Sequence, residues 1–250
     1  MRKYGFDGID IDYEFPKNKE NFNLLFKEFT EAFKEDKKRN CERLIITAAV
    51  SAGIETAKQS YDIANISNYV EFVNLMTYDF HAFQLMVKEK TLKIKGNYCF
   101  IGHGWTLANP NGSRKPVGSN ATGPSNATTY LKSEGIGAYF EFCEMLTDPT
   151  TKRAFDLNAK VPFLIYQKDQ WFSYDNIKSF KAKIDWIKGN GYGGAYVWTL
   201  DYDDFNGECT DSVDGIYPLI GTIARRMGNV KGPLIPISST TEKPLIEQNS

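Results

Sequence analysis

The first third of the chain alternates strand-like and helix-like hydrophobic patterns. In residues 6–14, Ile9 and Ile11 alternate with acidic side chains, which is the two-residue period of a β-strand. Residues 19–38 carry apolar side chains at helical spacing and predict an amphipathic helix. A strand, a short helix and a second strand are predicted next, at residues 43–50, 60–69 and 70–79. This alternation predicts a parallel sheet with right-handed crossovers.

The pattern is less regular in the rest of the chain. Residues 82–103 combine weak alternation with many charges, and residues 108–129 are typical of a polar loop. Helices are predicted at residues 135–147, 175–189 and 216–227, and strands at residues 161–174 and 195–200. The run 161–174 predicts one or two strands joined at Lys168 and Asp169. Residues 229–250 are rich in Pro, Ser and Thr without a core-forming pattern, and we expect a tail or linker.

Asp10, Asp12 and Glu14 occupy alternate positions of the first predicted strand and therefore share one face. Successive carboxylates on such a face lie about 6.5–7 Å apart. Tyr13 and the two isoleucines between them need burial on the other face, so we expect these acids inside a sheet or barrel rather than on a solvated edge. Like charges this close cannot all ionise, so at least one pKa rises, as general-acid catalysis requires. A metal site is the alternative, although neither histidine is near in the sequence.

Composition narrows the possible functions. The 250 residues suffice for one α/β barrel or two small domains. The net charge of −1 lacks the basic footprint of a nucleic-acid-binding protein, and no apolar run approaches the roughly 18 residues of a membrane span. Aromatic residues make up 14% of the chain, which fits either a large core or sugar-stacking surfaces.

Cysteines and glycosylation motifs point to an extracellular protein. The four cysteines have no CxxC spacing, so they do not predict a zinc site, and we expect one disulfide or none. Asn-x-Ser/Thr motifs begin at Asn65, Asn111, Asn120 and Asn126. The chain enters the first strand almost at once and shows no signal peptide. We therefore expect a secreted glycoprotein whose front end is missing from this chain.

Three separated motifs resemble one enzyme family. Residues 7–14, DGIDIDYE, resemble the DGxDxDxE signature of glycoside hydrolase family 18, the chitinase family. Residues 74–81, NLMTYDFH, resemble its MxYDxH strand, and residues 194–205 resemble its final-strand tryptophan motif. The resemblance runs from about residue 4 to residue 228 and is strongest to the secreted chitinases of animals.

The resemblance implies an α/β fold, a partial TIM (β/α)8 barrel with an inserted α+β subdomain. The fourth, fifth, sixth and eighth barrel strands are then expected at residues 9–14, 44–50, 70–79 and 195–200. The catalytic barrel fragment would span residues 1–228 and the subdomain about 106–172. Strands one to three are absent, and the sixth helix and seventh strand look deleted or replaced after His81. Such an open barrel exposes sheet edges, so we expect the chain alone to be poorly stable.

The resemblance also assigns roles to the acids. Glu14 would protonate the leaving oxygen, and no protein carboxylate would attack, because the substrate's N-acetyl oxygen is the nucleophile. Asp12 would orient the acetamide and stabilise its developing positive charge. Asp10 would sit behind Asp12 and share its proton. No cofactor or metal is implied.

Further substrate contacts and a disulfide are implied in the same way. Tyr78 would hydrogen-bond the acetamide oxygen, Asp79 would contact a sugar hydroxyl, and Trp198 would be the floor under the distorted sugar. Met76 and Trp171 are candidate substrate contacts, with packing as the alternative for both. Cys143 and Cys209 match the positions of a disulfide in the animal enzymes. Asp201 and Asp204 fit turn and capping roles at least as well as sugar contact.

The implied function is retaining endo-hydrolysis of β-1,4-N-acetylglucosamine linkages in chitin and chitooligosaccharides, by a monomer without nucleic-acid or membrane partners. Two alternatives stay open. One is a chitin-binding, lectin-like protein, although family lectins usually lose the position that Glu14 occupies here. The other is an inactive truncated family member.

Overall fold

A computed structural model describes residues 1–40, 42–77, 94–99, 101–110, 117–209 and 215–228. The chain forms two compact units, each of which is described by itself. Unit 1 comprises Met1–Phe100 and Ala182–Thr199, and unit 2 comprises Ile101–Lys181 and Leu200–Ser250.

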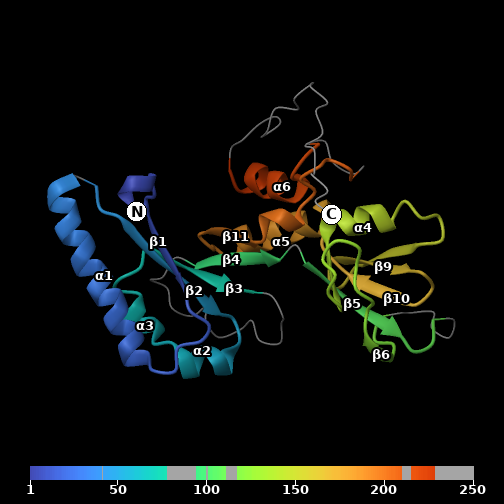
Figure 1. The fold of residues 1–250 in the computed structure, drawn as a ribbon, viewed down its shortest axis with the longest axis horizontal. Helices are drawn as coiled ribbons and strands as arrows, with labels where there is room; N and C mark the ends of the chain where they lie inside the picture. Colours follow the sequence, from blue (N-terminus) through green and yellow to red (C-terminus); the bar gives the residue numbers. More distant parts are fainter. Residues whose placement is uncertain (41, 78–93, 100, 111–116, 210–214, 229–250) are drawn as a thin grey trace, which may run out of the picture. The chain divides into compact units, whose positions relative to one another are not determined.

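Unit 1 is built on a parallel five-stranded sheet with the order β1-β2-β3-β4-β11 (Figure 1). Its strands are β1 Gly8–Asp12, β2 Ile45–Ser51, β3 Phe72–Met76, β4 Ile94–Cys99 and β11 Gly194–Trp198. Its helical elements are η1 Arg2–Tyr4, α1 Lys19–Asn40, α2 Ile54–Ser60 and α3 Ile63–Ile66, and α5 Ile177–Gly189 precedes β11. Gly8 is required where β1 approaches β2, since a Cβ there would lie 2.1 Å from the carbonyl oxygen of Ile45.

The apolar stripe of α1 forms the core of unit 1 with the sheet. Phe22, Phe26 and Phe33 are buried and belong to one cluster with Ile46 and Val50 of β2. Each fully buried phenylalanine contributes about 1.5–3 kcal/mol relative to an exposed one. This packing fixes β1 and β2, and with them the strand that carries the acidic residues.

The predicted elements of unit 1 are largely confirmed, with two corrections. The segment 60–69 was predicted as one helix, but α2 ends at Ser60 and α3 covers only Ile63–Ile66. The seventh strand is not deleted: β4 lies between β3 and β11 in the sheet. The charged run at residues 88–95, which ends at the start of this strand, hid it, since strand pairing uses backbone hydrogen bonds that any residue type except proline can make. The predicted loss of the sixth helix concerns residues 78–93, outside the described residues.

Unit 2 contains an antiparallel sheet with the order β6-β5-β10-β9-β8, and β7 pairs with β5. Its strands are β5 Ile101–Leu107, β6 Ala121–Pro124, β7 Ile136–Ala138, β8 Lys152–Asp156, β9 Val161–Tyr166 and β10 Gln170–Ser173. Its helices include α4 Tyr139–Met145 and α6 Pro218–Met227, and η3 spans Leu200–Tyr202. Phe142 of α4 packs on Phe172 and Tyr174, at ring-centroid distances of 5.3 and 4.8 Å.

In unit 2 the hairpin at 161–174 is confirmed, with its turn at Lys168 and Asp169. The predicted loop 108–129 contains the short strand β6, and the predicted helix 135–147 begins as β7 before α4. The strand β8 was missed because most of its side chains are exposed, which leaves no clear hydrophobic alternation. The boundaries predicted for the subdomain stay a prediction, and the predicted tail lies outside the described residues.

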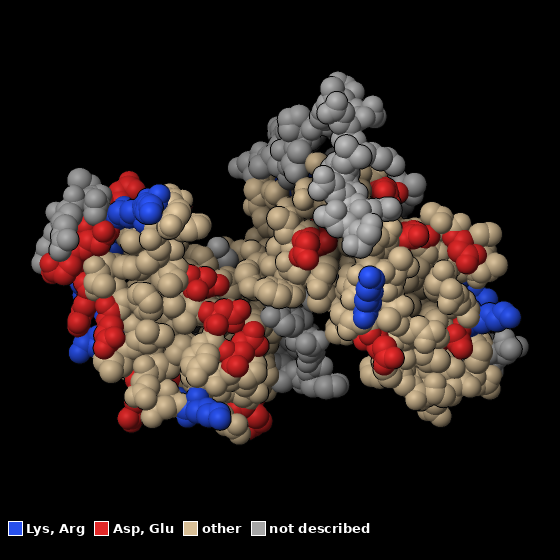
Figure 2. All heavy atoms as spheres, viewed as in Figure 1, with Lys and Arg blue, Asp and Glu red and all other residues tan. Residues whose placement is uncertain are grey.

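The surface of both units carries charges of both signs on the face drawn in Figure 2. Among the helices that the structure describes, none has the length and apolarity needed to cross a bilayer.

Candidate active site

The acidic residues of the first motif lie on β1 and just after it. Asp10 and Asp12 belong to the strand, but the strand ends at Asp12, so Glu14 is not the last residue of a strand as predicted. The peptide bonds after Glu14 and Trp198 are cis. Because the chain turns after Asp12, the position of Glu14 is set by this turn and not by strand alternation alone.

The expectation that these acids lie inside a sheet is wrong for Asp10, Asp12 and Glu14. All three residues are exposed, and Tyr13, which was expected to be buried, is 54% exposed. Ile9 and Ile11 do pack against the core of unit 1. The reason is the position of the strand, since among the described strands β1 pairs only with β2 and forms an edge of the sheet.

Asp10 is held by two neighbouring strands. The hydroxyl of Thr47 on β2 donates a 2.5 Å hydrogen bond to Oδ1, and Nδ2 of Asn74 on β3 donates a 3.2 Å bond to Oδ2. Thr47 and Asn74 are both buried. Sequence reasoning named Asn74 within a motif without giving it this role, and it did not identify Thr47.

Glu14 and Asp12 interact directly. Glu14 is an exposed residue, but partial burial of its carboxyl raises its pKa, and the charge of Asp12 and a side-chain hydrogen bond with it add to this rise. A like charge nearby disfavours a second ionised carboxylate, which is the physical cause of the second contribution. A carboxyl with a raised pKa next to an acidic partner keeps its proton to a higher pH, as a proton donor requires.

Two tyrosines that sequence reasoning missed lie near the acids. Burial raises the pKa of Tyr61 to about 12, and the charges of Glu14 and Asp12 contribute. Burial also raises the pKa of Tyr196, to which Asp12, Asp10 and Glu14 add. β11 and β1 stand at opposite ends of the sheet order. The sheet therefore curls enough for the charges of the acidic residues to affect the pKa of Tyr196. One signal was available, because Tyr196 lies two residues before Trp198 on the same strand face.

The remaining predicted contacts are distributed over the chain. Trp198 ends β11 and is 46% exposed, so its ring is accessible to a ligand. Met76 ends β3 and is buried, as core packing requires. Trp171 belongs to β10 of unit 2. Tyr78 and Asp79 lie outside the described residues.

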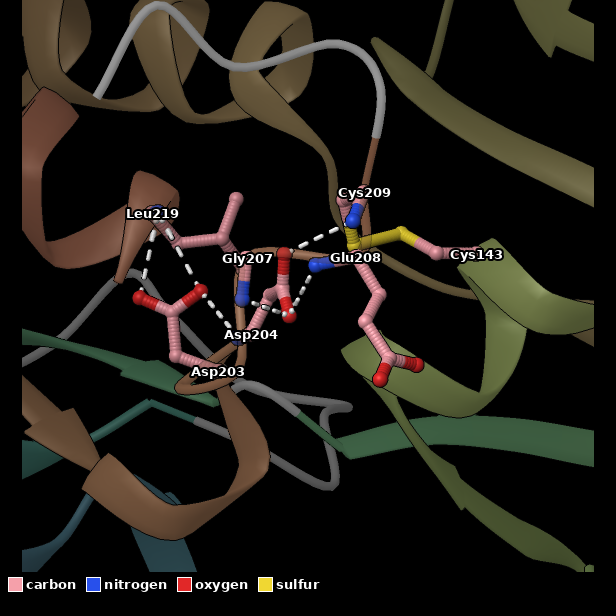
Figure 3. Close-up of a disulfide and its surroundings, with 7 residues drawn as sticks. All are labelled: Cys143, Asp203, Asp204, Gly207, Glu208, Cys209 and Leu219. Carbon is pink, nitrogen blue, oxygen red and sulfur yellow. Dashed lines mark hydrogen bonds between the residues drawn. A yellow bond between two sulfur atoms is a disulfide. The ribbon is translucent and has the colours of Figure 1, made fainter. Parts of the chain in front are cut away.

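The predicted disulfide between Cys143 and Cys209 is confirmed, with a Cα–Cα distance of 5.2 Å (Figure 3). Asp204 accepts hydrogen bonds from the backbone N–H groups of Gly207, Glu208 and Cys209, so it shapes the loop that carries one cysteine (Figure 3). This is the turn role that the sequence allowed for Asp204.

Asp203 was not singled out by sequence reasoning, and it is fully buried. Its carboxylate accepts hydrogen bonds from the N–H groups of Leu219 and Ile220 at the start of α6. Burial raises the pKa of Asp203 to about 6, although these donors lower it. Within the described parts of the chain, no group of three or more His, Cys, Asp or Glu residues is arranged to hold a metal ion.

Several known proteins are similar to this chain in sequence and fold. A probable endochitinase of Caenorhabditis elegans is 37% identical over 269 residues, which cover 92% of this chain and 42% of that protein. The chain thus spans less than half the length of this relative. The crystal structure of an immunomodulatory active chitinase from Trichuris suis matches with a TM-score of 0.82 and 37% identity, over 91% of this chain and 70% of that one.

A third match is human YKL-39, described as a pseudo-chitinase with retained chitooligosaccharide binding properties. It is 29% identical, with a TM-score of 0.79, over 90% of this chain and 70% of that one. These structures confirm the predicted partial TIM-barrel fold. The model of glycosyl hydrolases family 18 matches residues 1–203, and the chain therefore belongs to this family.

Proposed function

We propose that the chain hydrolyses β-1,4-N-acetylglucosamine linkages inside chitin and chitooligosaccharides, with retention of configuration. The observation that carries this proposal is the pair of Glu14 and Asp12, in which burial and the Asp12 charge raise the pKa of Glu14. A protonated carboxyl at this position is the general acid that glycosidic bond cleavage needs. Hydrogen bonds from Thr47 and Asn74 hold the Asp10 side chain in place. Asp10 would act through Asp12, its neighbour on the same strand face.

In the first step, Glu14 gives its proton to the glycosidic oxygen while the bond from this oxygen to the anomeric carbon breaks. The carbonyl oxygen of the substrate's own acetamide attacks the anomeric carbon and forms an oxazolinium ion. Asp12 accepts a hydrogen bond from the acetamide N–H and stabilises the positive charge. Asp10 shares the proton of Asp12, which lets the Asp12 side chain turn toward either neighbour.

In the second step, the Glu14 carboxylate takes a proton from a water molecule. The hydroxide attacks the anomeric carbon, the bond to the acetamide oxygen breaks, and the N-acetyl group is restored. Two displacements at one carbon retain its configuration. Glu14 ends the cycle protonated, as it began.

Other residues would position the sugar. The half-exposed ring of Trp198 is the floor under the sugar at the cleavage point. Tyr78 binds the acetamide oxygen, and Asp79 binds a hydroxyl. Met76 is buried at the end of β3 and limits the depth of the site. Trp171 would contact a more distant sugar.

We also propose that the protein is a secreted, monomeric glycoprotein. The disulfide between Cys143 and Cys209 favours an oxidising compartment. Asn120 and Asn126 are exposed, as an N-glycan requires. Mass spectrometry of the protein from its native source, before and after removal of N-glycans, tests the disulfide and the glycosylation. Unmodified sequons together with free thiols would contradict a secreted glycoprotein.

The test of catalysis compares the wild type with Glu14→Gln on a fluorogenic chitotriose substrate. Glutamine keeps the shape of the side chain but cannot donate the proton, so we expect cleavage to fall by a factor of about 100 to 10,000. Glu42→Gln, which removes an exposed acid of the same unit, should leave cleavage unchanged. Equal activity of wild type and Glu14→Gln would contradict the proposal.

A second candidate function is binding of chitooligosaccharides without cleavage. The match to a pseudo-chitinase that retains such binding supports it, as does the exposure of Asp10 and Asp12. Chitin pull-down in parallel with the assay distinguishes the two functions. Binding without cleavage by the wild type favours the lectin-like protein. The absence of both binding and cleavage favours an inactive chain.

A further inference from the structure

The antiparallel sheet of unit 2 has two different faces. On one face, Phe172 of β10 is fully buried under Phe142 of α4. Trp171 and Ser173, the neighbours of Phe172 along the strand, point to the opposite face and are only half-buried. On β9, Phe163 is half-buried in the same way. The second face therefore presents aromatic side chains that this sheet does not need for its core.

Aromatic rings from three adjacent strands meet on this second face. Trp105 of β5 stands directly opposite Trp171 of β10 in the antiparallel register, and Trp105 is 49% exposed. Side chains in such cross-strand positions have Cβ atoms about 4.5–5.5 Å apart. The ring of Phe163 lies 6.1 Å from that of Trp171, with an angle of 34° between the planes. Together they form a continuous aromatic surface.

A small pocket opens beside the two tryptophans. It has a volume of about 230 Å³ and is lined by Trp105, Leu107, Gly118, Ser119, Ala121 and Trp171. This volume is below the roughly 300–1,000 Å³ of pockets for drug-sized ligands, so it suits a single ring. The lining residues that the structure describes are all uncharged, which favours a neutral ligand over an ion.

Trp171, one of the lining residues, carries a polar group that lacks a partner. Nε1 of Trp171 is buried and has no hydrogen-bond acceptor among the described residues. A buried donor without a partner costs on the order of 1–3 kcal/mol. An acceptor oxygen on a ligand that reaches this nitrogen would offset the cost. The pocket thus combines flat aromatic surface with a lining tryptophan whose own N–H donor is unsatisfied.

We propose that Trp105, Trp171 and this pocket form a binding subsite for one N-acetylglucosamine unit of a chitooligosaccharide. A pyranose ring has an apolar face that packs on an indole, and its hydroxyl and acetamide oxygens supply acceptors for an N–H donor. The ring is neutral, as the lining requires. The identity of the sugar rests on the proposed function, whereas the binding of a neutral ring rests on the pocket itself.

The test measures binding of chitohexaose by isothermal titration calorimetry to the full chain carrying Glu14→Gln, which prevents cleavage. The protein is produced in a host that adds no N-glycans, because Asn120 of a sequon lies between two lining residues. Adding Trp105→Ala should weaken binding about three- to tenfold, as expected for loss of one aromatic contact. Trp186→Ala is the matched control, since Trp186 is 45% exposed on α5 and does not line the pocket.

A second variant, Ala121→Leu, fills the pocket while both tryptophans stay in place, and it should weaken binding as well. Circular dichroism checks that each variant is folded. Unchanged affinity in folded Trp105→Ala and Ala121→Leu would overturn the inference, as would equal weakening by Trp186→Ala. Cleavage by the wild type is scored separately. If the wild type cleaves chitin and Trp105→Ala leaves binding unchanged, only the proposed subsite is contradicted. If the wild type does not cleave chitin and Trp105→Ala weakens binding, the subsite is supported and the proposed hydrolysis is contradicted.

Discussion

Asn74 on β3 donates a 3.2 Å hydrogen bond to Asp10 on β1, and its side chain therefore reaches across β2, which lies between these strands. Thr47 on that intervening strand donates to the other oxygen of the same carboxylate. Both donors are buried and belong to strands fixed by the core of unit 1. Asp10 therefore has a defined orientation although its own strand is an edge.

Replacing Thr47 by valine should slow catalysis by roughly tenfold, because one hydrogen bond to the Asp10 side chain is lost while the shape is kept. We expect the loss in kcat rather than KM, since Asp10 would act through Asp12 and does not bind the sugar itself. Steady-state kinetics on chitotriose substrates measure both constants.

Thr30→Val is the matched control for this change. Thr30 is also a buried threonine of unit 1, and its hydroxyl has no hydrogen-bond partner among the described residues. Its replacement should leave kcat unchanged. An equal fall in both variants would show that the effect arises from general destabilisation and not from the position of Asp10.

Replacing Asp12 by asparagine should lower the pKa of Glu14. Burial is the largest cause of the raised pKa and would persist, but the like charge of Asp12 would be gone. Glu14 would then lose its proton at lower pH, so the alkaline limb of the kcat/KM profile of the residual activity should move to lower pH. Carbon-13 NMR of labelled glutamate reports the same pKa directly.

Asp7→Asn serves as the control for the Asp12 variant. It removes an exposed acid of the same segment, before the strand begins. The alkaline limb should stay in place in this variant. A profile that moves equally with Asp7→Asn, or does not move with Asp12→Asn, would contradict a direct effect of Asp12 on Glu14.

The sequence was sufficient to predict the strand of acids, the helix that covers it and the parallel sheet. These depend on local patterns, such as the alternation around Ile9 and Ile11 and the stripe of α1. The contacts of Asp10 were not predictable in this way, because Thr47 and Asn74 lie 37 and 64 residues away. Their approach depends on strand register, which no local pattern specifies.

Burial was the weakest part of the prediction. Tyr13 alternates as a core residue would, yet it is 54% exposed, because β1 ends at Asp12 and the chain turns there. The strand β4 was missed for a different reason, since Lys95 and the charged residues that precede the strand make this part of the sequence look like a surface loop. Alternation indicates which residues share a face, but the order of strands decides whether that face is covered.

Removing the disulfide by Cys143→Ser with Cys209→Ser should destabilise unit 2 by about 2–4 kcal/mol, because the bridge closes a long loop of the unfolded chain. The two cysteines are 66 residues apart. Urea unfolding followed by tryptophan fluorescence measures the change. Dithiothreitol should lower the midpoint of the wild type but not that of the double variant, and equal sensitivity to dithiothreitol would contradict the assignment.

Asp203 should make the stability of unit 2 depend on pH. Its pKa is raised from 3.8 to about 6, so between these values the folded chain binds more protons than the unfolded chain. Stability from this group is therefore fully present below pH 3.8 and is lost as the pH rises through about 6. The loss is on the order of 3 kcal/mol, from roughly two pKa units at 1.36 kcal/mol each.

Asp203→Asn removes the titration but keeps an amide oxygen as an acceptor for the start of α6. We expect the variant to be less stable at low pH, because one of the two acceptor oxygens is lost, but to lack the decline between pH 4 and 6. Asp156→Asn is the control, since backbone N–H groups lower the pKa of this half-buried residue and its contribution is lost only as the pH falls. Urea midpoints from pH 3.5 to 7 measure the effect. The same decline in wild type and Asp203→Asn would show that another group causes it.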